Sequence, residues 1–373
     1  MFTSGIIEVD GTHYNESPFD NETVDESEDY EGQIIQELEE KNQIYSATFE
    51  LTYDCNERCI HCYANFPTEE KNVNVVSLQK YKSVIDELYA MKCLHLAFTG
   101  GDPFLYEDFF EVFKYSRSKG FVCDIFTNGL YLYNNSKTLD EILSLRPRAF
   151  YISLYGSNPE THDYITNVVG SFKKTTEVIK KIKAAEIPVV LNVMVLNTNC
   201  HDVQGIMALA EELGVDYRIS ISVINRNDGD ATPNNYRVKD TETIGNILRI
   251  VNKKLYSMDK ESTVYTRGEY MCGAGVTSLC ISPDGTVFPC VSLKNPLGNI
   301  YEDSLTACWN GEPRKKLRDS LKWEKTKECY NCKYSEVCLH CAGISQAETG
   351  DMLSCNECDK DIAKCRYGLF HYE

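Results

Sequence analysis

The chain has 373 residues, 42% of them hydrophobic, which is long enough to bury a large core in one big domain or in two to three smaller ones. No run of about 18 apolar residues is present, and no basic segment followed by an apolar run opens the sequence, so we expect neither a membrane span nor a secretory signal and place the protein in the cytoplasm. The formal net charge of −18 argues against nucleic acid as a partner, because a polyanion is bound by basic surfaces.

The segment 1–46 is the most acidic part of the chain. It contains thirteen Asp or Glu and a single Lys, so it contributes −12 to the net charge. Residues 15–29 are polar and poor in large apolar side chains, which is typical of a mobile segment, whereas 32–42 has the pattern of a short helix. We expect either a solvated tail or an arm that docks a substrate peptide or a partner.

From residue 47 onward, strand-like and helix-like segments alternate. Strands that alternate with helices along the chain form right-handed βαβ units and a parallel sheet. The segment 47–267 is therefore predicted to be an α/β domain with a partial (β/α)6 barrel. Apolar or β-branched runs predict strands at 48–53, 94–99, 122–127, 149–154, 188–195 and 215–223. Helical spacing predicts helices at 78–91, 106–119, 171–185, 203–213 and 241–256.

The alternation stops near residue 268. The segment 268–373 is rich in cysteines and loops, and its SPDGT motif at 282–286 is a strong turn signal that predicts a hairpin. Few long apolar runs are present, so we expect bound metal to supply part of the stability of this segment.

The 17 cysteines are spaced for metal ligation rather than for disulfides. A reducing compartment disfavours a disulfide framework, and an odd number fits one poorly. Three cysteines lie near the start of the predicted barrel and eleven lie between residues 272 and 365. The isolated ones are expected to be small buried hydrophobes: Cys93, Cys123 and Cys200.

The first group, Cys55, Cys59 and Cys62, has the spacing CxxxCxxC in a loop after the first predicted barrel strand. Parallel barrels keep their sites at this C-terminal mouth. Three thiolates on one compact loop can ligate three irons of a cubane cluster and leave the fourth iron open. The alternative is a closed zinc site, which needs a fourth ligand; His61 is awkwardly placed for that role within the short CIHC segment.

This motif, with Tyr63 directly after it, resembles the signature of the radical S-adenosylmethionine (SAM) superfamily. The resemblance implies a catalytic [4Fe–4S] cluster on Cys55, Cys59 and Cys62, whose open iron is chelated by the amino and carboxylate groups of SAM. One-electron reduction would then release methionine and a 5′-deoxyadenosyl radical.

Further segments resemble SAM-binding parts of the same family. TGGDP at 99–103 resembles the GGEP motif, whose backbone meets the methionine amino group, and glycines let backbone approach a ligand closely. Ser153 matches a serine that contacts the ribose, and a stretch ending in HD…GSF matches as well, although Thr166 replaces its usual Arg. The alternatives are an ordinary turn and buried structural hydrogen bonds. The candidate SAM-binding residues are Tyr63, Gly100, Gly101, Asp102, Pro103, Thr127, Asn128, Ser153 and Asn192.

The cysteines after residue 272 resemble the SPASM extension of radical SAM enzymes that modify peptides and proteins, which binds two auxiliary [4Fe–4S] clusters. For the CxxC pairs alone, a zinc ribbon is the alternative. An additional cysteine, Cys280, either completes the first auxiliary cluster or leaves it with an open iron able to bind a substrate sulfur. The resemblance assigns Cys272, Cys290 and Cys341 to the first auxiliary cluster, and Cys329, Cys332 and Cys338 to the second, with Cys355 or Cys358 as its last ligand.

The two resemblances cover about residues 47–365 and imply an enzyme with SAM and three [4Fe–4S] clusters as cofactors. Its expected substrate is a ribosomal precursor peptide, leader plus core, in which it installs a thioether, C–C or C–O cross-link; ferredoxin or flavodoxin would supply the electron. Alternatives are modification of a protein side chain or of a small molecule such as a tetrapyrrole. A more distant one is a non-catalytic electron carrier or zinc scaffold, which would need neither TGGDP nor Ser153.

Overall fold

The computed structural model describes residues 9–10, 36–64, 75–251 and 269–371. Most of the acidic segment 1–46 therefore lies outside the described residues, as does the predicted helical stretch after residue 251. Residues 36–40 are helical, and 9–10 form a short strand, β1 (Val9–Asp10), paired antiparallel with β7. Among the helices described, none is both long and apolar enough to span a membrane.

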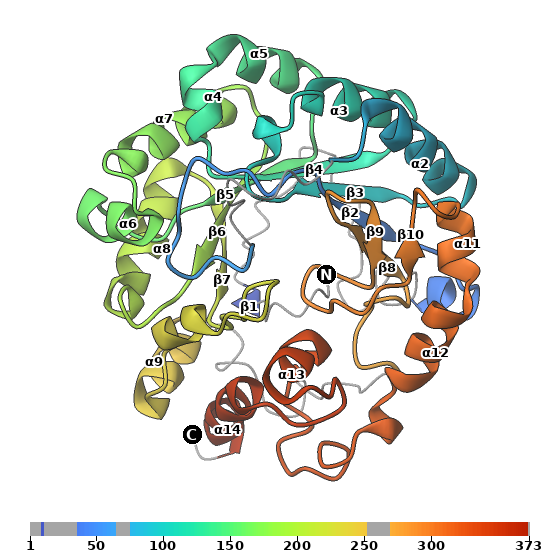
Figure 1. Cartoon of the computed structure of the whole chain (residues 1–373). Coiled ribbons are helices and arrows are strands. Elements are labelled where there is room, and N and C mark those ends of the chain that lie inside the picture. The colour runs from blue at the N-terminus through green and yellow to red at the C-terminus, as the bar shows by residue number, and fades with distance from the viewer. Residues whose placement is uncertain (1–8, 11–35, 65–74, 252–268, 372–373) are drawn as a thin grey trace, which may run out of the picture.

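A curved parallel sheet with helices on its outer side forms the body of the protein, as seen along the barrel axis in Figure 1. The predicted α/β fold class is confirmed. The six parallel barrel strands are β2 (Ser46–Glu50), β3 (His95–Thr99), β4 (Val122–Thr127), β5 (Ala149–Ser153), β6 (Val189–Met194) and β7 (Asp216–Ser220).

Helices connect these strands, and three of them were absent from the prediction. The sequence did carry a signal for the helix over 159–166. Asn158 caps this helix by accepting from Thr161 N at 3.0 Å, Pro159 follows, and Asn167 ends the helix with a positive φ of 58°. The predicted helices are α2 (Leu78–Ala90), α3 (Phe109–Ser118), α7 (Ser171–Ala184), α8 (Val203–Leu213) and α9 (Thr241–Val251). The additional ones are α4 (Leu130–Asn134), α5 (Ser136–Ser144) and α6 (Pro159–Thr166).

The two faces of the sheet differ in character. On the outer face, apolar side chains from neighbouring strands stand in one register row beneath the helices, and each contributes roughly 1.5–3 kcal/mol by burial. The members of this row are Phe49, Phe98, Ile125, Phe150 and Val189. The next row along the chain faces the interior and is mixed, running from Glu50 and Thr99 to Tyr151.

The N-terminal end of the barrel interior is filled by a polar network. Asp124 is fully buried and accepts from Arg148 Nε at 2.8 Å, while His95 Nε2 lies 3.0 Å from its other oxygen. Arg148 also donates to Tyr151 OH at 3.0 Å. The opposite, C-terminal end carries the cysteine loop.

The sheet continues into the cysteine-rich segment. The predicted hairpin is present as β8 (Ser278–Ile281) and β9 (Thr286–Phe288), followed by β10 (Gly298–Asn299). However, β8 also pairs in parallel with β2, which places Cys280 opposite Thr48. The result is one ten-stranded sheet that crosses the expected boundary at 267/268.

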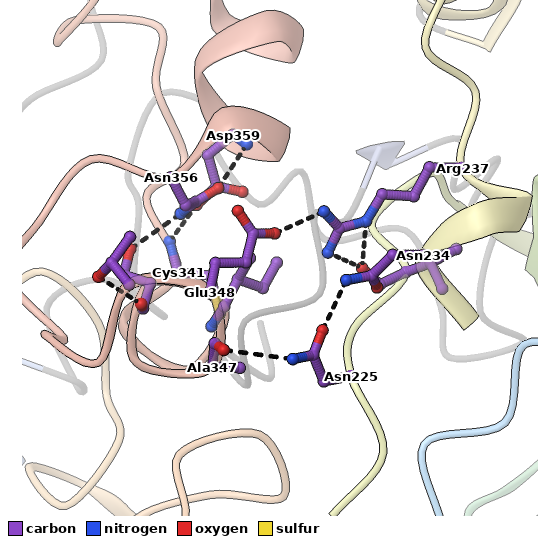
Figure 2. Close-up of polar contacts among 12 residues, drawn as sticks. Asn225, Asn234, Arg237, Cys341, Ala347, Glu348, Asn356 and Asp359 are labelled. Atoms are coloured by element: carbon purple, nitrogen blue, oxygen red, sulfur yellow. Dashed lines mark hydrogen bonds and ion pairs between the residues drawn. The ribbon is translucent and has the colours of Figure 1, made fainter. Parts of the chain in front are cut away.

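The remaining C-terminal helices are α11 (Leu305–Asn310), α12 (Glu312–Ser320), α13 (Ala342–Thr349) and α14 (Glu357–His371). In Figure 1, α13 and α14 lie below the open side of the sheet, whereas α11 and α12 lie at its β10 edge, with α11 next to α2. Polar contacts tie α13 to the barrel (Figure 2): Arg237 Nη1 lies 2.5 Å from Glu348 Oε1, and Asn225 Nδ2 donates to Ala347 O at 3.2 Å.

Candidate functional site

The CxxxCxxC loop leaves β2 at the C-terminal mouth of the barrel and is anchored on the side of β3. Gly101 N donates to Thr52 O at 2.7 Å, and Asp102 N donates to Asp54 O at 2.8 Å. The TGGDP segment therefore prolongs the pairing of β2 with β3 and fixes the start of the loop.

Both glycines of TGGDP are required by this close packing. A Cβ atom on Gly100 would lie 2.2 Å from Thr52 O, and one on Gly101 would lie 2.1 Å from Asp54 O, both far inside van der Waals contact. Gly100 also has a φ of 135°, which side-chain-bearing residues rarely adopt. The close approach seen here is thus to the cysteine loop itself.

The far side of the loop is anchored on α6. Arg58 N donates to Thr166 O and Ile60 N to Ile165 O, each at 3.0 Å. Cys59 packs with Tyr155 and Ile165 in a small buried cluster. The HD…GSF stretch thereby supports the loop, which crosses the barrel mouth towards α6 in Figure 1.

Asp102 joins the ends of β3 and β4. Its carboxylate is fully buried and accepts from Thr127 Oγ1 at 2.6 Å, from Asn128 N at 3.1 Å and from Phe104 N at 3.1 Å. Burial raises its pKa, and these three hydrogen bonds oppose the shift. Asp102 and Thr127 thus organise the strand ends, and Pro103 begins the 3-10 turn η1 (Pro103–Leu105).

Asn128 connects this arrangement to the first cysteine. Its Nδ2 donates to Asn56 Oδ1 at 2.7 Å and lies 3.6 Å from Cys55 Sγ. The candidate residues on the ends of β3 and β4 therefore gather around the cysteine loop.

The donor set of the loop fits an iron–sulfur cluster. Burial raises the pKa of Cys55 to about 12, and it raises the pKa values of Cys59 and Cys62 as well. The other two thiols raise the pKa of Cys59 further, so the three groups lie close enough to interact. Because this environment favours neutral thiols, cationic iron is what would hold all three as thiolates.

Two polar residues within the loop were missed as site residues. Among the described residues, neither Glu57 Oε1 nor His61 Nδ1 has a hydrogen-bond partner, although both atoms are buried. Burial raises the pKa of Glu57 to about 8 and lowers that of His61 to about 4. Such orphaned atoms fit a site that receives a bound group. The sequence signal that could have identified Glu57 and His61 was their position inside the CxxxCxxC motif.

Ser153 and Asn192 lie side by side. They are register partners on β5 and β6, and Arg218 on β7 is the next partner in the row. Residues paired in this way share a face of the sheet. The candidate ribose-contacting residue and the polar strand residue are therefore neighbours in the barrel interior, and Arg218 joins them without having been predicted.

A buried carboxylate links the cysteine loop with the C-terminal segment. Glu50 is fully buried and accepts from Tyr63 OH at 2.9 Å. Lys294 Nζ lies 3.1 Å from its other oxygen, and Cys280 Sγ lies 3.7 Å from that oxygen. Tyr63 thus points to Glu50, and neither Glu50 nor Lys294 was singled out from the sequence.

Cys290 interacts electrostatically with the three other cysteines considered for the first auxiliary cluster. Burial raises the pKa of Cys272 to about 12, and the nearby Cys290 adds to the shift. The pKa of Cys341 is raised by burial, then by Asp359, Cys290 and Cys272. Burial raises the pKa of Cys280, and Glu50 and then Cys290 raise it further.

Cys355, unlike Cys358, interacts electrostatically with the cysteines considered for the second auxiliary cluster. Burial and then the neighbouring Cys355 raise the pKa of Cys329 to about 12, and Cys332 adds to this shift. Cys329 and Cys355 also act on Cys338. The pKa of Cys358 is set by burial and by a different group of neighbours: Asp359, Arg237, Glu348 and Ser222.

The backbone around these cysteines is held by buried polar groups. Cys341 N donates to Asp359 Oδ2 at 2.6 Å, and Asn356 Nδ2 donates to the same oxygen at 2.7 Å (Figure 2).

In the part of the chain that the structure describes, no three His, Cys, Asp or Glu side chains lie close enough to hold a single metal ion.

Two family models match parts of this chain. Residues 49–210 match the Radical SAM superfamily, and residues 272–333 match the SPASM iron-sulfur cluster-binding domain. The solved structure of Streptococcus suis SuiB bound to S-adenosylmethionine is similar in fold, with a TM-score of 0.65 and 14% identity over 87% of this chain and 80% of that one.

Three relatives are similar in sequence along most of the chain. An AdoMet-dependent heme synthase of Methanosarcina barkeri is 29% identical, over 82% of this chain and 93% of its own length. The antilisterial bacteriocin subtilosin biosynthesis protein AlbA of Bacillus subtilis is 26% identical, over 79% and 66% respectively. A PqqA peptide cyclase of Ruegeria pomeroyi is 28% identical, over 65% and 66%.

Proposed function

Because this chain is an enzyme of the radical SAM superfamily that carries a SPASM iron–sulfur domain, we propose that it modifies a ribosomally made precursor peptide and installs a cross-link in it. The cofactors, SAM and the iron–sulfur group held by Cys55, Cys59 and Cys62, would supply a 5′-deoxyadenosyl radical that abstracts a hydrogen atom from the substrate. The cytoplasm is the proposed location, since such thiolate ligands need a reducing compartment.

The chain's own residues would position the reactants. Gly100, Gly101 and Asp102 fix the cysteine loop, while Ser153 and Asn192, in the barrel interior, would hydrogen-bond SAM. Since Tyr63 and Lys294 meet on Glu50, the wall between the loop and the first auxiliary cysteines is held rigid. Positioning of this kind is the main protein contribution when the cofactor supplies the reactive species.

We propose three [4Fe–4S] clusters in total. Cys272, Cys280, Cys290 and Cys341 form one auxiliary set, and Cys329, Cys332, Cys338 and Cys355 form the other. During cross-linking, the substrate loses a hydrogen atom to the adenosyl group, a proton to solvent and one electron; an auxiliary cluster is the proposed acceptor of that electron. A reduced ferredoxin or flavodoxin is the proposed donor for the radical step.

The observation that carries the peptide substrate is the likeness to AlbA and to the PqqA peptide cyclase. The charge of the chain supports it. A net charge of −18 suits a basic peptide and opposes a polycarboxylate. In the described interior, Lys294 is paired with Glu50, and Arg218 also has a protein partner.

A second candidate is modification of a tetrapyrrole, because the M. barkeri relative is a heme synthase and is 29% identical. A substrate with several carboxylates would need cations that the described interior commits elsewhere. We therefore rank this reaction below peptide modification.

The decisive experiment uses a short precursor encoded beside this chain, incubated anaerobically with SAM and dithionite. We expect the peptide to lose two hydrogens in mass for each cross-link, with 5′-deoxyadenosine formed alongside, and a leader-less core peptide to react much more slowly. Unchanged peptide mass together with consumption of a carboxylated tetrapyrrole would instead establish the second candidate.

The acidic segment is proposed to dock the basic leader of the peptide. Its described end is fixed to the body, because Arg318 donates to Glu39 O at 2.5 Å and to Asn42 Oδ1 at 2.8 Å. Replacing the acidic residues of 16–31 by Asn and Gln leaves β1 and these contacts in place and should weaken peptide binding at low salt. Unchanged peptide affinity after this neutralisation would contradict the docking role.

A further inference from the structure

A cation lies beside the third cysteine of the CxxxCxxC loop. Burial raises the pKa of Cys62, whereas the guanidinium of Arg226 opposes this shift. Arg226 belongs to the connection between β7 and α9, residues 221–240, and its side chain is only 25% exposed. The positive charge is therefore largely withdrawn from solvent and acts on the loop.

Hydrogen bonds fix the backbone of Arg226 next to the loop. Asn227 N donates at 2.9 Å to the carbonyl oxygen of Tyr63, the residue that follows Cys62. Arg226 itself closes a tight turn, since its N donates to Asp230 O and its O accepts from Gly229 N, each at 2.9 Å. These backbone contacts place Arg226 beside the loop independently of any charge.

The connection is anchored on both sides of this turn. Before it, Val223 packs with Cys59 in the small buried cluster described above. After it, Arg237 pairs with Glu348 on α13 (Figure 2). Because the connection is held at both places and at Tyr63, Arg226 keeps a defined position relative to the cysteines.

Carboxylates otherwise dominate the surroundings of the loop. Besides burial, Asp102 and Glu57 raise the pKa of Cys55. Glu57 and Glu50 do the same for Cys62. An iron–sulfur group gains one negative charge when it is reduced, and its potential depends on the charges around it. An ionised carboxylate at this range opposes reduction, whereas a cation favours it.

Two further cations near the loop act less directly on it. Lys294 Nζ lies 3.1 Å from a carboxylate oxygen of Glu50, which offsets its charge. Arg58 is exposed, so water screens its guanidinium. Arg226 is the better placed of the three to act on an iron–sulfur group.

We propose that the charge of Arg226 stabilises the reduced form of the iron–sulfur group on the CxxxCxxC loop and so raises its reduction potential. Asp230 Oδ2 lies 3.7 Å from Arg226 Nε, but the Asp230 side chain is 41% exposed, so water screens its charge more. In the reducing step an external donor loses one electron and the iron–sulfur group gains it, while Arg226 exchanges neither an electron nor a proton. The inference rests on the proposed function, because it requires an iron–sulfur group on the loop.

The test compares three variants of the full, iron-loaded enzyme. Arg226→Gln removes the charge, Arg226→Lys keeps it, and Lys239→Gln removes one charge from an exposed position of the same connection. The readout is the midpoint potential of the loop's iron–sulfur signal in an EPR-monitored titration without SAM. That signal is the part of the wild-type spectrum that disappears when Cys55, Cys59 and Cys62 are all replaced by Ala.

We expect Arg226→Gln to lower the equilibrium constant for reduction about tenfold, which corresponds to about 59 mV for one electron. Arg226→Lys should recover most of this loss, and Lys239→Gln should leave the potential unchanged. Iron content should stay at the wild-type value in all three variants.

An unchanged potential in a fully iron-loaded Arg226→Gln would overturn the inference. So would an equal shift in Lys239→Gln, which indicates net charge rather than position, or an equal loss in Arg226→Lys, which indicates shape rather than charge. Iron loss from Arg226→Gln would overturn a role in the potential, because cluster binding itself would then need the cation. Failure of the proposed function is distinguishable, since the wild type and the triple Ala variant would then give the same spectrum.

Discussion

Asp102 stands where the related GGEP motif has Glu, and the structure gives the shorter carboxylate a clear role. Both of its oxygens accept hydrogen bonds within the protein, from the ends of two strands and from the turn that follows it. The side chain acts on the cysteine loop through backbone position. The resemblance made Asp102 a candidate SAM-binding residue, which stays a prediction; it conveys which motif is present but not which groups each carboxylate oxygen meets.

Asp102→Asn should therefore destabilise the protein and weaken SAM binding together. The new amide nitrogen at position 102 would face one of the three donors, Thr127 Oγ1, Asn128 N or Phe104 N. One buried hydrogen bond is then lost, which lowers the free energy of unfolding by about 1–3 kcal/mol. Anaerobic urea unfolding and equilibrium SAM binding measure the two effects. Glu107→Gln, an exposed neighbour, is the control and should change neither; an unaltered unfolding free energy in Asp102→Asn would refute the role.

His162 predicts a dependence of stability on pH. Burial lowers its pKa to about 4 from an ordinary value of 6.5, while its Nδ1 accepts from Tyr155 N at 3.1 Å. The unfolded chain therefore takes up a proton that the folded chain resists, so the free energy of unfolding should fall as pH drops from about 6.5 to 4, by up to about 3 kcal/mol.

His162→Asn keeps an acceptor near the position of Nδ1 and removes the titration. Urea unfolding at a series of pH values should show a flatter dependence over this window in the variant than in the wild type. Parallel curves for the two proteins would contradict a neutral buried imidazole.

At the scale of elements, sequence periodicity predicted the barrel strands and the longer helices closely. It missed α4, α5 and α6 because they are short. For α6, the cap residue Asn158 carries more signal than the periodicity does. Periodicity could not predict the contact of Glu50 with Lys294, because 244 residues separate the partners and no local pattern specifies such a pairing.

The glycine packing against the loop predicts a sharp difference between two substitutions. Gly101→Ala would force a Cβ against Asp54 O, so it should displace the cysteine loop and reduce both iron content and 5′-deoxyadenosine formation. Gly245→Ala in α9 meets open space and should be neutral or stabilising by about 1 kcal/mol. Iron analysis and activity of the two purified variants measure this, and equal behaviour would be inconsistent with the packing described.

Comparing the iron content of two variants, Cys355→Ala and Cys358→Ala, tests which cysteine is the last ligand of the second auxiliary set. Because Cys355 lies with Cys329 while Cys358 faces Arg237 and Glu348, Cys355→Ala should lower the iron content by up to about four and Cys358→Ala should not. Iron loss in the Cys358 variant alone would reverse the assignment.

On the scale of the whole molecule, three strands of the C-terminal segment, β8, β9 and β10, continue the barrel sheet. The change of composition at residue 268 suggested a boundary, yet the parallel pairing of β8 with β2 carries the sheet across it. Periodicity reveals that a strand exists and not which strand it joins, so this topology could not be predicted. The pairing brings Cys280 to Glu50 and thereby sets the auxiliary cysteines against the barrel interior.

One measurement tests the central claim, that the loop of Cys55, Cys59 and Cys62 generates the radical. The wild type and the triple Ala variant are reconstituted with iron and sulfide without oxygen, and 5′-deoxyadenosine is quantified after addition of SAM and dithionite. The wild type should hold about twelve irons and cleave SAM, and the variant should keep about eight irons and cleave none. SAM cleavage by the variant, or none by the fully loaded wild type, would contradict the claim.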